Sequence, residues 1–135
     1  MELLATFPFL RLHLHHDTGC RAIEAEWRGF VSSAFLRQAL TEALTLARRH
    51  GVQAWIADDR RLGPVRPADL EWVVTTVVPE FITLGIERFA MVEAEDPLNK
   101  LLITNATDTV TQELPLLVRR FTDPEAARRW ACQGE

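Results

Sequence analysis

The sequence contains little cysteine, glycine and serine, and each shortage excludes a class of site. Its two cysteines, Cys20 and Cys132, lie near opposite ends of the 135 residues and form neither a metal-binding spacing nor a disulfide framework, so we expect two reduced thiols. The six glycines are scattered, which excludes a glycine-rich phosphate loop. The two serines, Ser32 and Ser33, are accounted for by the N-terminal cap of a helix.

Charge and hydropathy exclude further partners. The net charge of −4 gives no general attraction for phosphates, which argues against nucleic acid and against an anionic membrane surface. The longest apolar stretch, Trp72–Ile86, contains Pro79 and Glu80 and is too short and polar to span a bilayer. The first residues, Met1–Leu4, lack the basic region of a signal peptide. We therefore expect a cytoplasmic protein without membrane insertion.

Hydrophobic residues make up 47% of the chain and charged residues 25%, which is enough to form the core of one domain over residues 1–135. The segment Leu10–His15 alternates strictly, with three leucines on one face and Arg11, His13 and His15 on the other. Residues Arg21–Trp27 alternate again after a turn, and together the two segments predict a β-hairpin. Apolar residues at helical spacing then predict a helix that follows Ser32-Ser33 and ends at Gly51.

The signals for secondary structure are less uniform in the middle of the chain. Val52–Ala57 is typical of a strand covered on both faces, and Asp58–Pro64 reads as a polar loop after it. The stretch Pro67–Leu84 has strand propensity in its valines and threonines, but its apolar spacing and length favour a helix. Pro79 should kink or split that helix.

A strand is predicted over Ile86–Ala94, and Asp96-Pro97 should open a short helix through about Thr104. The segment Asn105–Gln112 fits helix or loop. Leu116–Phe121 is predicted as the last strand, and Thr122–Glu125 has the spacing of a capping box that opens a terminal helix. The predicted fold class is therefore α/β, with a mixed, mostly parallel sheet, an N-terminal hairpin, crossover helices and the order ββαβαβαβα.

This order, together with particular residues, resembles the STAS-like family, and especially its bacterial SpoIIAA-like branch, also labelled STAS/SEC14. The similarity spans roughly residues 8–132 and implies a regulatory or protein-interaction module rather than an enzyme. It rests on Trp27, Trp55–Asp58, Leu70–Trp72, Pro79, Gly85–Ala90, Phe121–Asp123, Ala127 and Trp130.

The resemblance also sets expectations about regulation. In the anti-sigma-factor antagonists of that family, a partner kinase phosphorylates a serine just beyond the central strand. The corresponding stretch here, Asp58–Gly63, holds no serine or threonine, so the resemblance implies that this switch is absent. The SEC14 label implies lipid transfer, but a chain of this length that must also fill its own core has little room for a lipid cavity.

Four charged residues form the first candidate site. Asp58, Asp59, Arg60 and Arg61 follow the predicted central strand, and ligands in open α/β sheets bind beyond the carboxyl ends of strands. The alternative is a surface loop whose opposite charges pair weakly. Trp72 lies beside Glu71 and could anchor a partner at the edge of the second helix.

Histidines and glutamates on the hairpin form the second candidate group. His13 and His15 share a strand face and could ligate a metal, but no third ligand is evident, and a solvated face explains them equally well. Glu24 and Glu26 could act as an acid–base pair only in a pocket that separates their pKa values, and on an exposed hairpin they are solubilising charges. No catalytic residue, metal site or cofactor is therefore predicted.

Two functional hypotheses remain. In the first, the chain docks a protein partner, or a second copy as a homodimer, through Asp58–Arg61 and the adjoining second helix. In the second, a small apolar ligand or lipid binds between the sheet and the second helix, near Trp55 and Trp72. No reaction can be named for an enzyme.

Overall fold

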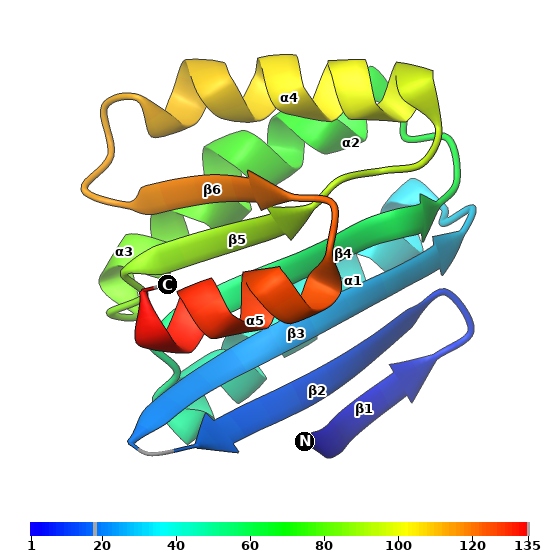
Figure 1. Ribbon diagram of the computed structural model, residues 1–135. Coiled ribbons are helices and arrows are strands. Elements are labelled where there is room, and N and C mark those ends of the chain that lie inside the picture. The colour runs from blue at the N-terminus through cyan, green and yellow to red at the C-terminus, as the bar shows by residue number, and fades with distance from the viewer. Residues whose placement is uncertain (18, 135) are drawn as a thin grey trace.

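A six-stranded sheet runs through the molecule with its strands in chain order (Figure 1). The computed structural model describes residues 1–17 and 19–134. The strands are β1 (Glu2–Phe7), β2 (Leu10–Asp17), β3 (Cys20–Gly29), β4 (Ala54–Leu62), β5 (Arg88–Val92) and β6 (Leu117–Phe121). The helices are α1 (Ser33–His50), α2 (Pro67–Trp72), the π-helical η1 (Val73–Val77), α3 (Val78–Thr83), α4 (Pro97–Thr111) and α5 (Pro124–Gln133).

The sheet is mixed. Strands β1, β2 and β3 pair antiparallel, and β3, β4, β5 and β6 pair parallel. The predicted α/β class and the N-terminal hairpin are confirmed, but the predicted order missed β1, so the chain opens with three strands. The pairing of β1 with β2 shifts register between Leu3 and Ala5, and this irregularity interrupts the alternation by which a short strand is recognised.

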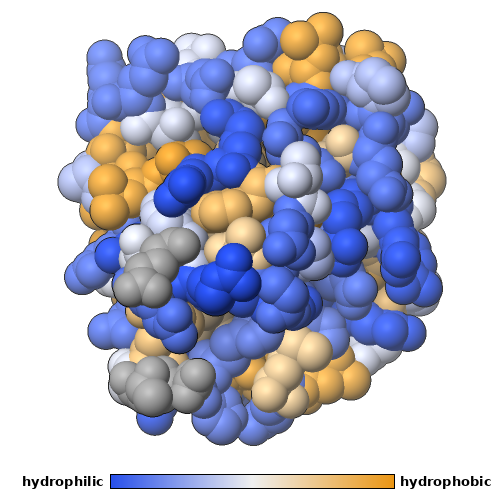
Figure 2. Space-filling model, in the orientation of Figure 1, coloured by the Kyte–Doolittle hydropathy of each residue, from blue (hydrophilic) through white to orange (hydrophobic). Residues whose placement is uncertain are grey.

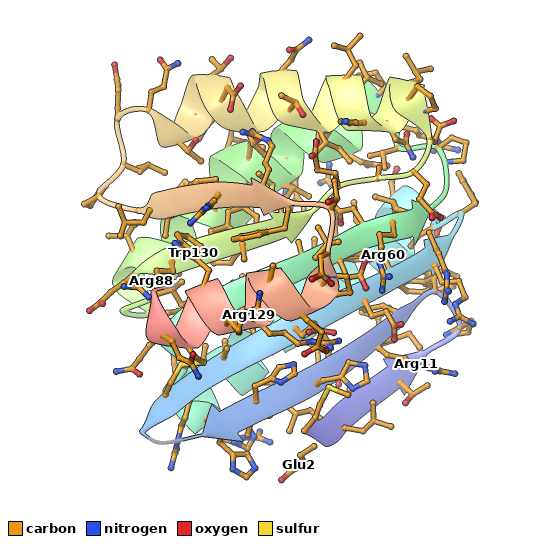
Figure 3. All side chains as sticks on the ribbon, in the orientation of Figure 1. Glu2, Arg11, Arg60, Arg88, Arg129 and Trp130 are labelled. Carbon is orange, nitrogen blue, oxygen red and sulfur yellow. A yellow bond between two sulfur atoms is a disulfide. The ribbon has the colours of Figure 1, made fainter. Side chains whose placement is uncertain are left out.

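Alternation along the strands divides the core into two layers. Leu10, Leu12 and Leu14 of β2 all face the larger layer, as their spacing predicts, where the sheet packs against α1 and the α2–η1–α3 segment. Helix α5 lies on the opposite face of the sheet (Figure 1), where Trp130 packs over Ile56 and the alanines of β3, β4 and β5. Arg88 of β5 secures this helix, because its guanidinium donates to the Trp130 carbonyl at 2.9 Å (Figure 3).

Helix α1 has the predicted ends. The Ser32 side chain accepts a hydrogen bond from the Phe35 amide at 3.4 Å, as an N-cap should. Gly51 ends the helix in the left-handed region with φ of 58°, a conformation that glycine adopts without steric penalty.

The stretch after β4 is helical, which confirms the choice of helix over strand. It is split as predicted, because η1 separates α2 from α3 just before Pro79. The Val78 amide donates to the Val73 carbonyl, five residues back, which is the π-helical pattern. Pro79 has no amide hydrogen to donate to the preceding turn, so the series of backbone hydrogen bonds along the helix is already interrupted there. The wider π-helical turn lies next to this interruption.

Several boundaries differ from the prediction, including those of β5, which is shorter than the predicted Ile86–Ala94. The polar loop expected at Asp58–Pro64 is wrong over its first five residues, because β4 continues to Leu62. The short helix expected to stop near Thr104 continues to Thr111, which settles the open segment as helix, with threonine hydroxyls bonded to carbonyls one turn back. Helix α5 is capped by the Asp123 side chain, not by Thr122.

The prediction for the two cysteines is wrong as well. Cys20 at the start of β3 and Cys132 in α5 form a disulfide with a Cα–Cα distance of 5.4 Å, although 112 residues separate them. The expectation of two reduced thiols failed because parallel strand pairing and the crossover of α5 bring together residues that no local spacing relates. Separately, none of the helices in residues 1–17 and 19–134 is long and apolar enough to cross a membrane.

The disulfide can be checked by counting thiols. Protein that is denatured without reductant should show no thiol that reacts with a colorimetric reagent, and prior reduction should reveal both. Two reactive thiols before reduction would instead restore the expectation from the sequence.

Candidate functional site

An apolar cavity of about 90 Å³ lies between the sheet and the helices that cover its larger layer. Four aromatic side chains from three strands and α3 form much of its wall, namely Trp27, Trp55, Phe81 and Phe89. The rings of Trp55 and Phe81 stack with centroids 4.6 Å apart, and Phe81 meets Phe89 edge-on at 5.3 Å. These contacts fix the wall, so the space is part of the packed fold.

The π-helical segment η1 forms the side of the cavity opposite the sheet. It contributes Val73, Val74 and Val77, of which Val74 and Val77 are buried. A π-helical turn is wider than an α-helical turn and has weaker packing of its own backbone, and such turns occur often at functional sites. The least regular helical segment of the chain therefore borders its apolar cavity.

Asp59 is the one charged residue among the described residues that line this cavity. Trp55, Ala57 and Asp59 alternate along β4 and point to the same side of the sheet, which places a carboxyl beside apolar walls. The side chain is 7% exposed, and it forms no hydrogen bond or ion pair within the part of the chain that the structure describes. Burial, helped by the neighbouring Asp58 charge, raises the pKa of Asp59 to about 7.

Asp59 also borders a smaller, more polar cavity of about 10 Å³, which Glu93, Lys100 and Arg120 line as well. Both cations already have anionic partners. Lys100 lies 3.6 Å from the Glu93 carboxylate, and Arg120 donates to Asp108 at 2.6 Å. Neither cation therefore neutralises Asp59.

The other three residues of the predicted charged site lie elsewhere. Asp58 points to the α5 side of the sheet, where it forms a two-pronged ion pair with Arg60 at 2.9 and 2.8 Å. The Arg60 side chain is labelled in Figure 3. Arg61 is exposed. The structure thus separates Asp58 and Asp59, although they are adjacent in the chain, because successive residues of a strand face opposite sides.

Trp72 ends α2 and is half-buried, with the Arg37 guanidinium 5.2 Å from its ring centroid. Trp27, Trp55 and Trp130 are buried, as core packing predicts. Trp72 is therefore the most accessible of the four tryptophans, but it does not line the apolar cavity.

The face of the sheet toward α5 carries a polar network that sequence reasoning missed. Arg128 of α5 donates to both oxygens of Glu24 at 2.8 and 3.0 Å, and it also contacts Glu125. His15 lies 3.0 Å from the same Glu24 carboxylate. Burial alone raises the pKa of Glu24, but the hydrogen bonds from His15 and Arg128 outweigh it and hold the pKa at about 2.

The expectation that Glu24 is an exposed solubilising charge is therefore wrong, since the residue is 2% exposed. No local signal could have revealed its partner, because Glu24 and Arg128 are 104 residues apart. His13 is likewise paired with Glu26 at 3.3 Å. Within residues 1–17 and 19–134, no group of three or more histidine, cysteine or acidic residues is arranged to hold a metal ion. Outside the buried network, the surface of this face is mainly hydrophilic (Figure 2).

Comparison with known proteins bears on the architecture. No family model and no curated protein matches the chain. Among solved structures, the chain is similar to an uncharacterized protein of the DUF3478 family from Shewanella loihica PV-4, which has a SpoIIAA-like fold. The two share 16% identity with a TM-score of 0.63, over 96% of this chain and 99% of the other. This chain has a SpoIIAA-like fold.

The SpoIIAA-like fold confirms the resemblance seen in the sequence, and at this level of identity it is evidence for architecture alone. The match runs over nearly the full length of both chains, so it includes the strands and helices that surround Asp59. Any function must be argued from the cavity and its chemistry.

Proposed function

We propose that this chain is a non-enzymatic, STAS-like binding module that holds one small, largely apolar molecule between its sheet and the α2–η1–α3 segment. The observation that carries the proposal is the cavity with aromatic walls and, among its described lining residues, a single carboxyl. Apolar pockets with a few polar groups are the usual form of small-molecule sites. The proposal develops the second hypothesis from the sequence. It keeps Trp55 as part of the site and replaces Trp72 with Asp59.

The volume limits the ligand. Pockets for drug-sized ligands measure about 300–1,000 Å³, and a cavity of about 150 Å³ holds benzene or xenon. The cavity here, at about 90 Å³, is smaller than both, so it suits a compact ligand rather than a lipid tail. Lipid transfer, which the SEC14 label implies, is therefore no part of the proposal.

Absence of catalysis is part of the proposal. Of the polar groups in the described cavity wall, Thr107 is already engaged, because its hydroxyl donates to the Ile103 carbonyl at 2.7 Å and accepts from Arg120 at 2.8 Å. Asp59 is left as a lone acid or base without a second group to complete an acid–base pair. This arrangement supports holding a molecule more than transforming it.

Docking of a protein through Asp58–Arg61 and Trp72 stays a prediction. The geometry supports it less, because Asp58 forms an ion pair with Arg60 on one face of the sheet and Asp59 is buried on the other.

The absence of a phosphorylation switch at the end of β4 is also a proposal. It is supported by Ser32 and Ser33, which both lie at the start of α1, where Ser33 donates to Asp69 at 2.8 Å.

Xenon is a suitable first probe, because it enters small apolar cavities without needing any polar group. Xenon should shift the methyl NMR signals of Val74 and Val77 in the wild type. Ala57→Leu should abolish the shifts by placing a larger side chain in the cavity, and Val73→Phe should weaken them from the rim. Ala68→Leu, the same substitution at an exposed position of α2, is the matched control and should leave them unchanged. Unshifted valines in the wild type would refute the cavity as a binding site.

A further inference from the structure

One residue, Asp59, indicates which polar group a ligand of this cavity should carry. Asp59 combines three properties that seldom occur together: it is 7% exposed, it faces a cavity, and it has no partner within the described chain. Buried charges in proteins are normally paired, because leaving one unpaired is strongly unfavourable. A carboxyl in this state is suited to a partner that comes from outside the protein.

The surrounding charges leave room for such a partner. On β4, the neighbouring Asp58 is neutralised by Arg60 on the other face of the sheet. Glu93, which follows β5, pairs with Lys100 of α4, and Arg120 of β6 is bound to Asp108. The segments α1, η1 and α3 contribute only apolar side chains to the described cavity wall. Among the described residues, Asp59 therefore faces no free cation from any element packed against it.

The walls favour the same kind of ligand. The aromatic rings of Trp27, Trp55, Phe81 and Phe89 present apolar surface, which suits the alkyl body of a small cation. An anionic ligand would meet a second negative charge, and a purely apolar one would leave the carboxyl unpaired. A cationic head on a short apolar body satisfies the carboxyl and the walls together.

We propose that the ligand of this cavity is a small organic amine, whose ammonium group pairs with Asp59 and whose short alkyl body fills the space between Trp55 and η1. The inference rests on the proposed function, because it names the ligand class for the same cavity. A body of about four non-hydrogen atoms matches the volume. A larger amine would have to extend toward the smaller cavity beside Lys100.

Two probes of equal size separate charge from apolar contact. At pH 8, n-propylamine is protonated and n-propanol is neutral, and both can be titrated against the valine methyl signals of η1. The wild type should bind propylammonium about tenfold or more tightly than propanol. Both probes can donate a hydrogen bond to the carboxylate, but only the ammonium group adds the attraction of opposite charges. Asp59→Asn, which keeps shape but removes charge, should abolish the difference. Glu42→Gln removes an exposed carboxylate on α1 and should preserve it.

The pH dependence provides a second readout. Only the ionised carboxyl attracts an ammonium group, and the pKa of Asp59 is about 7. Affinity for propylammonium should therefore rise about tenfold per pH unit up to pH 7 and then level off, whereas affinity for propanol should not rise with it. Asp59→Asn should show no rise for either probe.

The outcomes distinguish failure of the amine as the ligand from failure of the cavity as a binding site. Equal affinities for the amine and the alcohol, or an unchanged preference in Asp59→Asn, would overturn the amine and leave the cavity standing, provided that xenon binds. Failure of xenon, propanol and propylamine alike to shift the valine signals of the wild type would overturn both the amine and the proposed function.

Discussion

Arg128→Ala should lower the free energy of unfolding by about 3–5 kcal/mol at neutral pH, because it leaves the Glu24 carboxylate buried without its main partner. Of the other described side chains, only His15 lies within hydrogen-bond distance of that carboxylate. Chemical denaturation followed by tryptophan fluorescence would measure the loss. Arg129→Ala removes the neighbouring exposed arginine of α5 and should change stability by less than about 0.5 kcal/mol.

The effect of Arg128→Ala should depend on pH with a definite sign. The folded state lowers the pKa of Glu24 from 4.5 to about 2, so it binds fewer protons than the unfolded state in that range. The stability that the ionised group contributes is therefore complete above about pH 4.5 and is lost as the pH falls toward 2. The difference between Arg128→Ala and the wild type should shrink over that window. A loss that is independent of pH would mean that Arg128 acts through packing alone.

Asp59→Asn should stabilise the protein at pH 8 by up to about 4 kcal/mol. The pKa of Asp59 rises from 3.8 to about 7 on folding, so the folded state binds more protons than the unfolded state between these values. Stability that depends on this group is therefore present below about pH 4 and is lost as the pH rises through 7. Asparagine cannot ionise and escapes that loss.

The advantage of Asp59→Asn should grow from about 2 kcal/mol at pH 5 to about 4 kcal/mol at pH 8, which denaturation at the two pH values would show. Glu42→Gln, at an exposed position, should show no such growth. A variant less stable than the wild type at pH 8 would mean that the Asp59 carboxylate has a favourable partner. A ligand that co-purifies with the protein is one such partner. If that ligand is an amine, dialysis at low pH should release it, because the protonated carboxyl no longer attracts an ammonium group.

Together, Glu24 and Asp59 show why two carboxyls in one sheet behave oppositely. Glu24 lies on the α5 face, where Arg128 and His15 provide hydrogen bonds that outweigh burial. Asp59 lies on the other face, where the described walls of its cavity provide none, so burial dominates. Glu24 stabilises the fold, whereas Asp59 destabilises it at neutral pH. A residue that a fold keeps at the expense of its stability is a candidate for binding.

The elements best predicted from the sequence are those whose signals are local. Strict alternation at Leu10–His15 and helical spacing between Ser33 and His50 each reflect one buried face, and both predictions are confirmed. The end of β4 was misread because Asp58 and Asp59 resemble a polar loop, and only the folded sheet shows that each charge has its own buried environment. The sequence indicated Asp59 as a site residue because it follows the central strand. It did not show the apolar cavity that surrounds the carboxyl.

The remaining errors concern pairs that are distant in the chain. Cys20 meets Cys132, and Glu24 meets Arg128, because α5 lies across β3, β4 and β5 (Figure 1). Charge and spacing in a single sequence contain no information about which of many arginines reaches a given glutamate. The sequence suggested a ligand between the sheet and the second helix, but it did not show the shape of the cavity. That shape depends on the widened turn of η1 and on rings from four separate segments.

A crystal structure of the protein under xenon pressure tests the central claim most directly, because it locates the probe without assuming any ligand. We expect a xenon atom inside the cavity, between Trp55, Phe81 and Val77, with the rings unmoved. A structure in which η1 has closed onto β4, with no xenon there at pressures that fill other protein cavities, would contradict the claim that this space is a binding site.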